Sequence, residues 1–273
     1  RQIMGGDITG KMIIPLVEQT DGNFTAEFMG TKFTARSKRE VEELEKKIRT
    51  SGFYPYRTEP EGLAELQKDS RKVDELFPKL MAETTERWIR IAEDRLKGTG
   101  IQCYLMAGND DQFIVDEVID KSDYVVNPEG KVLQLDDYHE MISTGYSNIT
   151  PWNCPRDISE EELDGKIEAM ASQVKNMQNC IFNFHCPPYD TSLDVAPKLD
   201  KNLKPVVSGG QVIMEHVGSV AVRKAIEKYQ PLLGMHGHIH ESKGTFKIAR
   251  TVCINPGSEY TEGILRCMLV VID

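Results

Sequence analysis

Three of the six histidines of the chain lie within five residues, in the stretch HGHIH at 236–240. A single histidine is usually a structural residue, but the spacing H-x-H directly after an apolar run allows two imidazoles to reach neighbouring positions. His238 and His240 are therefore candidate ligands for divalent metal ions. His236 precedes the motif within the apolar run, and we expect it to pack or to orient a ligand.

Further residues with nitrogen or oxygen ligand atoms also follow short apolar runs. The runs are flanked by Gly or Pro and are rich in Ile, Val, Leu, Phe or Met, which is typical of strands buried on both faces. Because loops leaving the carboxyl ends of parallel strands converge at one edge of a sheet, we expect these residues to form a single site. A mixed set of N and O ligands suits Mn, Fe or Zn better than Ca or Mg. The residues are Asp7 after QIMGG, Asn109 and Asp110 after CYLMAG, His185 after CIFNF, and Asn255 after TVCI.

Helices are expected between these runs. Ser159 and Glu162 form a capping-box pattern, and apolar residues then recur at helical spacing as far as Met177, which predicts a helix over 160–178. A second helix is expected from about residue 220 until Pro231 ends it. The alternation of strands and helices predicts an α/β architecture.

Residues 31–98 differ in pattern from the rest of the chain. Ser37 and Glu40 begin a short helix, and a longer run of helical periodicity follows as far as Lys97, with Pro78 expected to kink or split it. We interpret 31–98 as a helical insertion over the core. Two roles stay open for it: it shapes the mouth of a substrate site, or it only packs on the sheet.

Composition excludes several classes of protein. With 273 residues, 40% of them hydrophobic, the chain can bury a sizeable core. The formal net charge of -10 argues against long nucleic acid as a partner, because binding to duplexes normally depends on clustered Lys and Arg. No run reaches the roughly 18 apolar residues of a membrane-spanning helix, so we expect no membrane partner. The six cysteines are scattered without a C-x-x-C pair, which favours a reducing, cytoplasmic location.

The order of the motifs is the strongest functional signal in the sequence. The chain contains GGD at 5–7, GND at 108–110, His185 after a strand, GHIH at 237–240 and NPGS at 255–258. In this order the motifs resemble those of the calcineurin-like metallophosphoesterase family, and the match covers nearly the whole chain outside 31–98. The resemblance implies a single domain over 1–273 with a four-layer αββα fold, in which two β-sheets lie face to face with helices outside. It also implies a two-metal centre at the sheet edge.

The same resemblance assigns roles to individual residues. Asp7 would bridge the two metal ions, His240 would bind one of them, and the shell of the other would consist of Asn109, His185 and His238. Mn is the first choice for both ions, with Fe or Zn as alternatives. Such a centre would hydrolyse a small phosphomonoester or phosphodiester with a metal-bound hydroxide, because two cations can hold a phosphoryl group and lower the pKa of a bound water. The expected partner is therefore a small phosphate ester.

The chain departs from the family pattern at two places. The opening D-x-H motif, which in the family supplies two further ligands, is not among the six residues before Asp7. Because a strand, helix and strand take about 30 residues, we expect this motif on chain upstream of Arg1, so that the sequence is a fragment. Asp110 stands where most members have a histidine that protonates the leaving group. Asp110 could take that role only if its carboxyl were protonated; alternatively, Asp110 or Asp111 caps a helix that starts nearby.

His216 is a further candidate for substrate contact. It lies in SGGQVIMEHVGS, just before the helix expected from residue 220, where backbone N–H groups can meet phosphate oxygens. The alternative is that His216 only fixes its own loop. We therefore treat Asp110 and His216 as the candidate catalytic residues, and we expect His139, in the polar run DDYHEM, at the surface. Two other functions stay open: a binding module that holds at most one metal without turnover, and a metal-dependent hydrolase of a non-phosphate ester.

Overall fold

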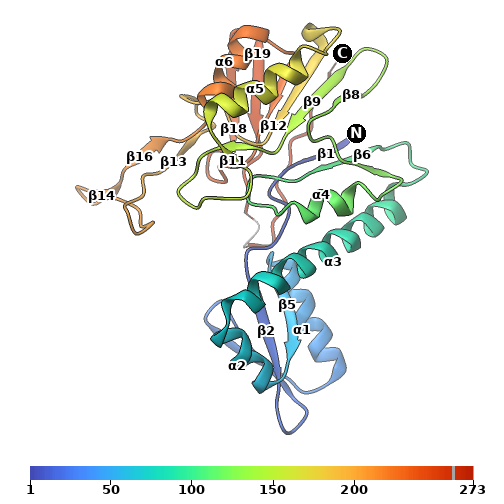
Figure 1. The fold of residues 1–273 in the computed structure, drawn as a ribbon, viewed down its shortest axis with the longest axis vertical. Coiled ribbons are helices and arrows are strands. Elements are labelled where there is room, and N and C mark those ends of the chain that lie inside the picture. The colour runs from blue at the N-terminus through green and yellow to red at the C-terminus, as the bar shows by residue number, and fades with distance from the viewer. Residues whose placement is uncertain (260–261, 273) are drawn as a thin grey trace. The chain divides into compact units, whose positions relative to one another are not determined.

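The computed structural model describes residues 1–259 and 262–272 and divides the chain into two compact units (Figure 1). Unit 1 comprises residues 1–8, 88–258 and 266–272, and unit 2 comprises residues 9–87 together with 259 and 262–265. The long helix α3, Ser70–Leu96, contributes its first residues to unit 2 and its last residues to unit 1.

Unit 1 contains two main β-sheets. The smaller sheet is parallel and has the strand order β1-β6-β7 (Gln2–Gly5, Cys103–Met106, Val125–Val126). The larger sheet has the order β18-β19-β17-β12-β9-β8 (Gly244–Ile248, Thr251–Asn255, Leu233–Met235, Cys180–Phe184, Glu140–Thr144, Val132–Gln134). Its four central strands run parallel to one another, and both edge strands are antiparallel. The carboxyl ends of the central strands therefore lie at one edge of the sheet.

Buried side chains on the two faces of the larger sheet define the layers. Phe182 of β12 packs with apolar residues of helices α5 (Glu160–Ala171) and α6 (Val220–Tyr229). Its neighbour Ile181 points to the opposite face, as alternation along a strand requires, and packs with Tyr104 of the smaller sheet. Helix α4 (Ile114–Ile119) follows β6 in the chain and buries Val115, Val118 and Ile119. The predicted α/β fold, with two sheets face to face and helices outside them, is confirmed.

Helix α5 begins as predicted but ends earlier. Its capping box is formed, since the Ser159 hydroxyl accepts a hydrogen bond from Glu162 N and the Glu162 carboxylate accepts one from Ser159 N. The helix ends at Ala171, and a separate 3-10 turn covers Met177–Asn179. Val174 still packs against the same core from outside the helix, so the apolar spacing continued beyond the helical backbone.

Unit 2 combines a four-stranded sheet with helices. The sheet has the order β4-β3-β2-β5 (Thr31–Ala35, Phe24–Phe28, Ile13–Glu18, Tyr54–Thr58), and helices α1 (Lys38–Thr50) and α2 (Pro60–Lys68) follow β4 and β5. Helix α1 starts at the predicted cap, Ser37, and packs Leu44 and Ile48 against Leu16 and Phe28 of the sheet.

The insertion expected at 31–98 therefore differs from the observed unit. The unit starts at Thr9 and includes strands, because β4 and β5 lie within the range that we expected to be helical. The hairpin between β3 and β4 turns at Met29 and Gly30, both with positive φ. This conformation is typical of tight hairpins, but Met-Gly is not one of the dipeptides that signal such a turn in a sequence. Of the kink or split predicted at Pro78, the split does not occur there, because helix α3 continues through Pro78; the helical run is divided at Asp69 instead, between α2 and α3.

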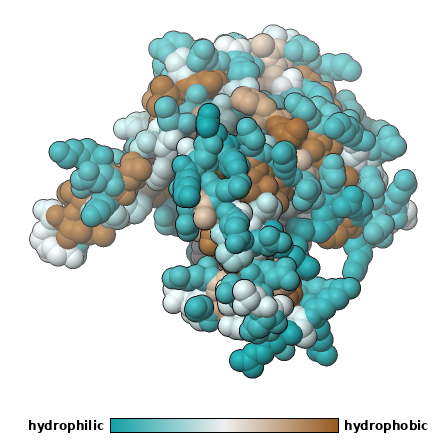
Figure 2. Space-filling view, turned by 60° about the horizontal axis from the view of Figure 1, so that its bottom comes forward, coloured by the Kyte–Doolittle hydropathy of each residue, from teal (hydrophilic) through white to brown (hydrophobic). Residues whose placement is uncertain are grey.

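Short paired strands complete unit 1. Strands β10 and β11 (Ser147–Asn148, Asp157–Ile158) pair in parallel, and β13 and β16 (Val195–Pro197, Met214–His216) form the base of an antiparallel arm that also contains β14 and β15 (Val207–Ser208, Gln211–Val212). The arm projects from the sheets (Figure 1) and carries apolar surface (Figure 2). No helix in the described part of the chain is long and apolar enough to cross a membrane.

Candidate metal centre

Residues from both sheets of unit 1 meet where their parallel strands end. Asp7 follows β1, His185 follows β12 and His238 follows β17. One ligand atom from each of these three side chains lies within 4.8 Å of the other two. Asp7 also belongs to a second group of the same kind, with Asp110 and Asp111. The structure thus brings together four of the seven residues that we predicted as metal ligands or catalytic groups, and Asp7 is shared by both groups.

The ring of His185 is held in one orientation. Its Nδ1 donates to the Gly5 carbonyl at 2.7 Å, and its Nε2 lies 3.2 Å from Asp7 Oδ1. His185 is buried, and burial lowers the pKa of its imidazole, but Asp7, the Gly5 carbonyl and Asp111 together raise it more, so the net pKa is raised. With Nδ1 bonded to the main chain, Nε2 is the nitrogen that faces the candidate ligands, as is usual for histidines at metal sites.

The His238 imidazole is neutral at neutral pH. Burial lowers its pKa to about 4, so at neutral pH the ring carries no charge and keeps a free lone pair. Its Nδ1 is buried without a hydrogen-bond partner among the described residues, and its Nε2 lies 3.5 Å from the Ser147 hydroxyl. Asn255 supports the loop, because its Nδ2 donates to the carbonyls of Gly237 and Ile239 at 3.2 and 2.9 Å.

Two candidate ligands have an unusual backbone. Asp7 and His238 have φ values of +50° and +64°, in the left-handed region that side chains with a Cβ seldom adopt. Such conformations cluster at functional sites, where surrounding contacts hold them in place.

Two glycines allow close contact between the loops that carry the candidate ligands: Gly6 lies against His185, and Gly108 lies against Asp7. A Cβ on Gly6 would lie 2.4 Å from His185 Nδ1, and a Cβ on Gly108 would lie 2.2 Å from both the backbone N and Oδ1 of Asp7. The glycines in GGD and GND therefore permit contacts that no larger residue could accommodate without movement.

Asn109 is buried and oriented by a residue that the sequence did not reveal. Its Nδ2 donates to Asp157 Oδ1 at 2.8 Å, while its Oδ1 has no hydrogen-bond partner within residues 1–259 and 262–272. The second oxygen of Asp157 accepts hydrogen bonds from Thr150 and Cys154. Asn109 thus offers an amide oxygen, the atom that a hard or borderline cation prefers, and Asp157 fixes which end of the amide is offered.

Asp111 has a different role from the one predicted. It is fully buried, and its Oδ2 accepts hydrogen bonds from Gly108 N at 2.6 Å and Ile8 N at 3.0 Å. Helix α4 begins at Ile114 without a side-chain cap, so the prediction that Asp110 or Asp111 caps it is wrong. Asp111 instead joins the loops after β1 and β6. The backbone N of Asp110 lies 3.5 Å from Asp7 Oδ1, and proton donation by Asp110 stays a prediction.

The remaining histidines lie outside the two groups. His240 follows His238 closely enough for its charge to contribute to the lowered pKa of His238. His236 is buried and donates from Nδ1 to the carbonyls on both sides of His185, consistent with an orienting position. His216 bonds to Asp194. His139 is buried against Asp136, so its expected surface position is wrong.

Comparisons with known proteins find partial similarity in sequence and in fold. No family model matches the chain. Over 143 residues the chain is 35% identical to the uncharacterized protein MJ1162 of Methanocaldococcus jannaschii. The matched region covers 51% of this chain and 58% of that protein. The chain thus spans less than two thirds of the length of this relative.

Two further comparisons concern a named hydrolase and a solved structure. Over 187 residues the chain is 25% identical to UDP-2,3-diacylglucosamine hydrolase of Escherichia coli O7:K1, covering 64% of this chain and 72% of that enzyme. A solved crystal structure superposes on this chain with a TM-score of 0.53, covering 90% of each chain. The sequence identity is 14%, so this comparison shows similarity of fold alone. The chain is therefore an α/β protein with distant similarity to a hydrolase.

Proposed function

We propose that the protein is a metal-dependent phosphoesterase that hydrolyses a small phosphomonoester or phosphodiester. The observation that carries this proposal is the pair of ligand groups that share Asp7, at the edge where parallel strands of both sheets end. Buried polar atoms fit such a centre, because Asn109 Oδ1 and His238 Nδ1 have no hydrogen-bond partner in the part of the chain that the structure describes. Buried polar atoms without a protein partner are rare unless a water or ion completes them.

The residues present suit two divalent cations. Asp7 would be shared between them, and Asn109, His185 and His238 would complete the shell of one. His240 and the Asp110 carboxylate are candidates for the other. Mixed imidazole, amide and carboxylate ligands favour Mn, with Fe or Zn as alternatives. When bound, such a pair of cations supplies positive charge for phosphoryl oxygens and makes water a nucleophile at neutral pH.

The side chains prepare this site before any substrate arrives. Gly5 holds the His185 ring, Asp157 holds the Asn109 amide, and the lowered pKa of His238 keeps its imidazole neutral. A preorganised set of this kind loses little free energy to reorganisation when it binds charge. The distant similarity to a hydrolase supports hydrolysis as the reaction class, whereas the phosphate ester is our inference from the ligand set and from the resemblance of the motifs.

The test compares His238→Ala with His139→Ala. His139 is also a buried histidine, but it lies at the turn before β9 and outside both ligand groups. We expect His238→Ala to lose Mn and the hydrolysis of an aryl phosphate, and His139→Ala to keep both. Unchanged Mn content and unchanged hydrolysis in His238→Ala would show that the assignment is wrong.

A second function is favoured by one residue. Asp110 stands where the resembled family has a histidine, and a centre without that imidazole could bind a phosphate ligand without turning it over. Under this alternative, the Mn-loaded protein binds inorganic phosphate but does not hydrolyse 4-nitrophenyl phosphate. Steady hydrolysis of that ester by wild type, lost in His238→Ala, would eliminate the alternative.

A further inference from the structure

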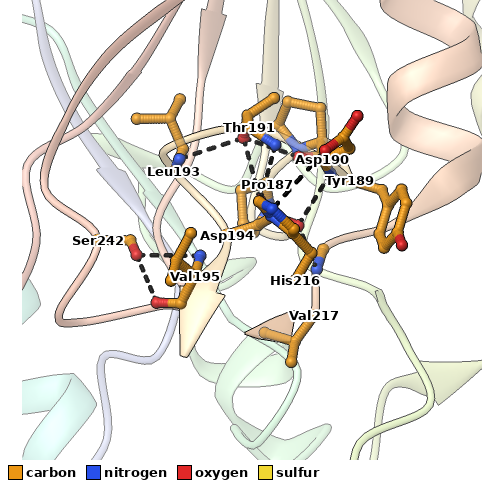
Figure 3. Close-up of polar contacts among 12 residues, drawn as sticks. Pro187, Tyr189, Asp190, Thr191, Leu193, Asp194, Val195, His216, Val217 and Ser242 are labelled. Carbon is orange, nitrogen blue, oxygen red and sulfur yellow. Dashed lines mark hydrogen bonds and ion pairs between the residues drawn. The ribbon is translucent and has the colours of Figure 1, made fainter. Parts of the chain in front are cut away.

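A second polar cluster lies in the loop that follows His185 and in strand β16 (Figure 3). At its centre is Asp194, whose carboxylate is fully buried. Its oxygens accept hydrogen bonds from the backbone N atoms of Asp190, Thr191 and Gly218 at 3.1, 2.9 and 3.0 Å. The Thr191 hydroxyl also donates to the carboxylate at 3.4 Å, and His216 donates from Nδ1 at 2.8 Å. A carboxylate held by so many donors is fixed in position, so it fixes the orientation of the imidazole that it contacts.

This arrangement leaves one nitrogen of His216 facing outward. Because Nδ1 bonds to Asp194, Nε2 is the nitrogen at the exposed edge of the ring, and 38% of the side chain is accessible. Three titratable groups face the ring: Asp194, Asp190, whose Oδ1 lies 3.6 Å from Nε2, and Tyr189, whose ring lies edge-on at 5.9 Å. The hydrogen bond to Asp194, together with both carboxylates, raises the pKa of His216. A larger fraction of the imidazole is therefore protonated near neutral pH.

The cluster is tied to both segments that carry the histidines of the metal centre and to strand β10, whose Ser147 lies next to His238. Ser219 N donates to the Pro187 carbonyl at 2.9 Å, two residues after His185. Asn148, next to the Ser147 that contacts His238, donates to the Val217 carbonyl at 3.2 Å.

The third link comes from beyond His240. The hydroxyl of Ser242 accepts from Val195 N at 3.1 Å and donates to the Val195 carbonyl at 2.6 Å, at the start of the strand that pairs with β16. His216 is thus fixed relative to the centre, although its side chain belongs to neither ligand group.

From this geometry we infer that His216 donates a proton to the leaving oxygen of the phosphate ester, and that Asp194 is the positioning residue that makes this possible. The inference rests on the proposed function. In the step, a water oxygen forms a new bond to phosphorus while the bond from phosphorus to the leaving oxygen breaks. The electron pair of that bond stays on the leaving oxygen, which takes the Nε2 proton of His216 and departs as an alcohol. The neutral imidazole, still bonded to Asp194, regains a proton from solvent, which balances the proton lost by the attacking water.

The experiment compares esters whose leaving groups need a proton to different degrees. Full chains loaded with Mn are assayed with phenyl phosphate, a poor leaving group, and 4-nitrophenyl phosphate, a good one. His216→Gln should lower kcat/KM for phenyl phosphate about 100- to 10,000-fold, the usual contribution of general acid catalysis. It should lower kcat/KM for 4-nitrophenyl phosphate much less, because that leaving group departs without protonation.

Asp194→Asn tests the positioning role. It should shift the alkaline limb of the pH profile for phenyl phosphate to lower pH, since the pKa of His216 falls when its carboxylate partner is removed. If Asp194→Asn does not fold, His216→Gln decides the matter, because the ring is part-exposed and makes a single hydrogen bond to a side chain. The matched control is His139→Gln, the same change at another imidazole bonded to an aspartate, and it should alter neither the rates nor their ratio.

The outcomes separate the two proposals. Equal losses on both esters in His216→Gln would overturn the donor role while leaving the phosphoesterase intact. No hydrolysis of either ester by the Mn-loaded wild type would refute the proposed function, and the donor role with it.

Discussion

Replacing Asp157 with asparagine should weaken Mn binding about 10- to 100-fold, although Asp157 is not itself a candidate ligand. The reason lies in its hydrogen bonds. Asp157 Oδ1 accepts from Asn109 Nδ2 at 2.8 Å, and Oδ2 accepts from Thr150 N, the Thr150 hydroxyl and Cys154 N at 3.0, 2.5 and 2.9 Å. The carboxylate thus serves three donors on one side and the Asn109 amide on the other.

An asparagine at position 157 has a single acceptor oxygen. The three donors around Oδ2 would hold that oxygen, which places the new NH2 group against the NH2 group of Asn109. Two donors cannot bond, so Asn109 would turn its amide and present Nδ2 where Oδ1 had been. An amide NH2 has no available lone pair for a metal. The expected loss corresponds to about 1.4–2.7 kcal/mol of binding free energy.

The assay is a Mn titration in competition with a fluorescent chelator. Asp164→Asn is the matched control, because it makes the same chemical change at an exposed position of α5. The fold should survive in Asp157→Asn, with a decrease of about 0.5–1.5 kcal/mol in the free energy of unfolding for the lost hydrogen bond. A Mn affinity equal to that of wild type and Asp164→Asn would refute the assigned role of the Asn109 oxygen.

Two further perturbations test packing and electrostatics in unit 1. Gly108→Ala places a Cβ 2.2 Å from backbone and side-chain atoms of Asp7, so it should lower the free energy of unfolding by about 1–3 kcal/mol and abolish Mn binding. The control is Gly165→Ala, whose Cβ would meet nothing within 4 Å. In thermal denaturation this variant should be as stable as wild type or more stable. Burial raises the pKa of Glu129 above its ordinary value, so the folded state holds this proton more tightly than the unfolded chain does, and the free energy of unfolding falls as pH rises through the raised pKa. Glu129→Gln should therefore flatten the pH dependence of Tm above the ordinary glutamate pKa of about 4.3, and an unchanged slope would contradict this.

The part of the site that could be predicted from the sequence is the part encoded locally. Each of Asp7, Asn109, His185 and His238 follows directly on an apolar run, and the carboxyl ends of parallel strands bring such positions together. The capping box at Ser159 likewise depends on residues three apart, and it was predicted correctly.

The supporting residues depend on contacts between distant parts of the chain. Asp157 reaches Asn109 across 48 positions, and Asp111 bonds to Ile8 across 103 positions, so neither role leaves a pattern in a short window of sequence. The strands of unit 2 were missed for a related reason. They are short, and their hairpin turns at Met29 and Gly30 without a recognisable turn dipeptide. The helical periodicity that follows them is longer and is therefore the stronger pattern in this part of the sequence.

The most direct test of the proposed centre is the number of Mn ions retained per chain, measured by native mass spectrometry of wild type and Asp7→Asn after removal of excess metal. Asp7 belongs to both ligand groups, so one substitution should empty both, and asparagine tolerates the positive φ at this position. We predict at least one Mn per wild-type chain and none in Asp7→Asn. Equal Mn counts in the two proteins would contradict the central claim.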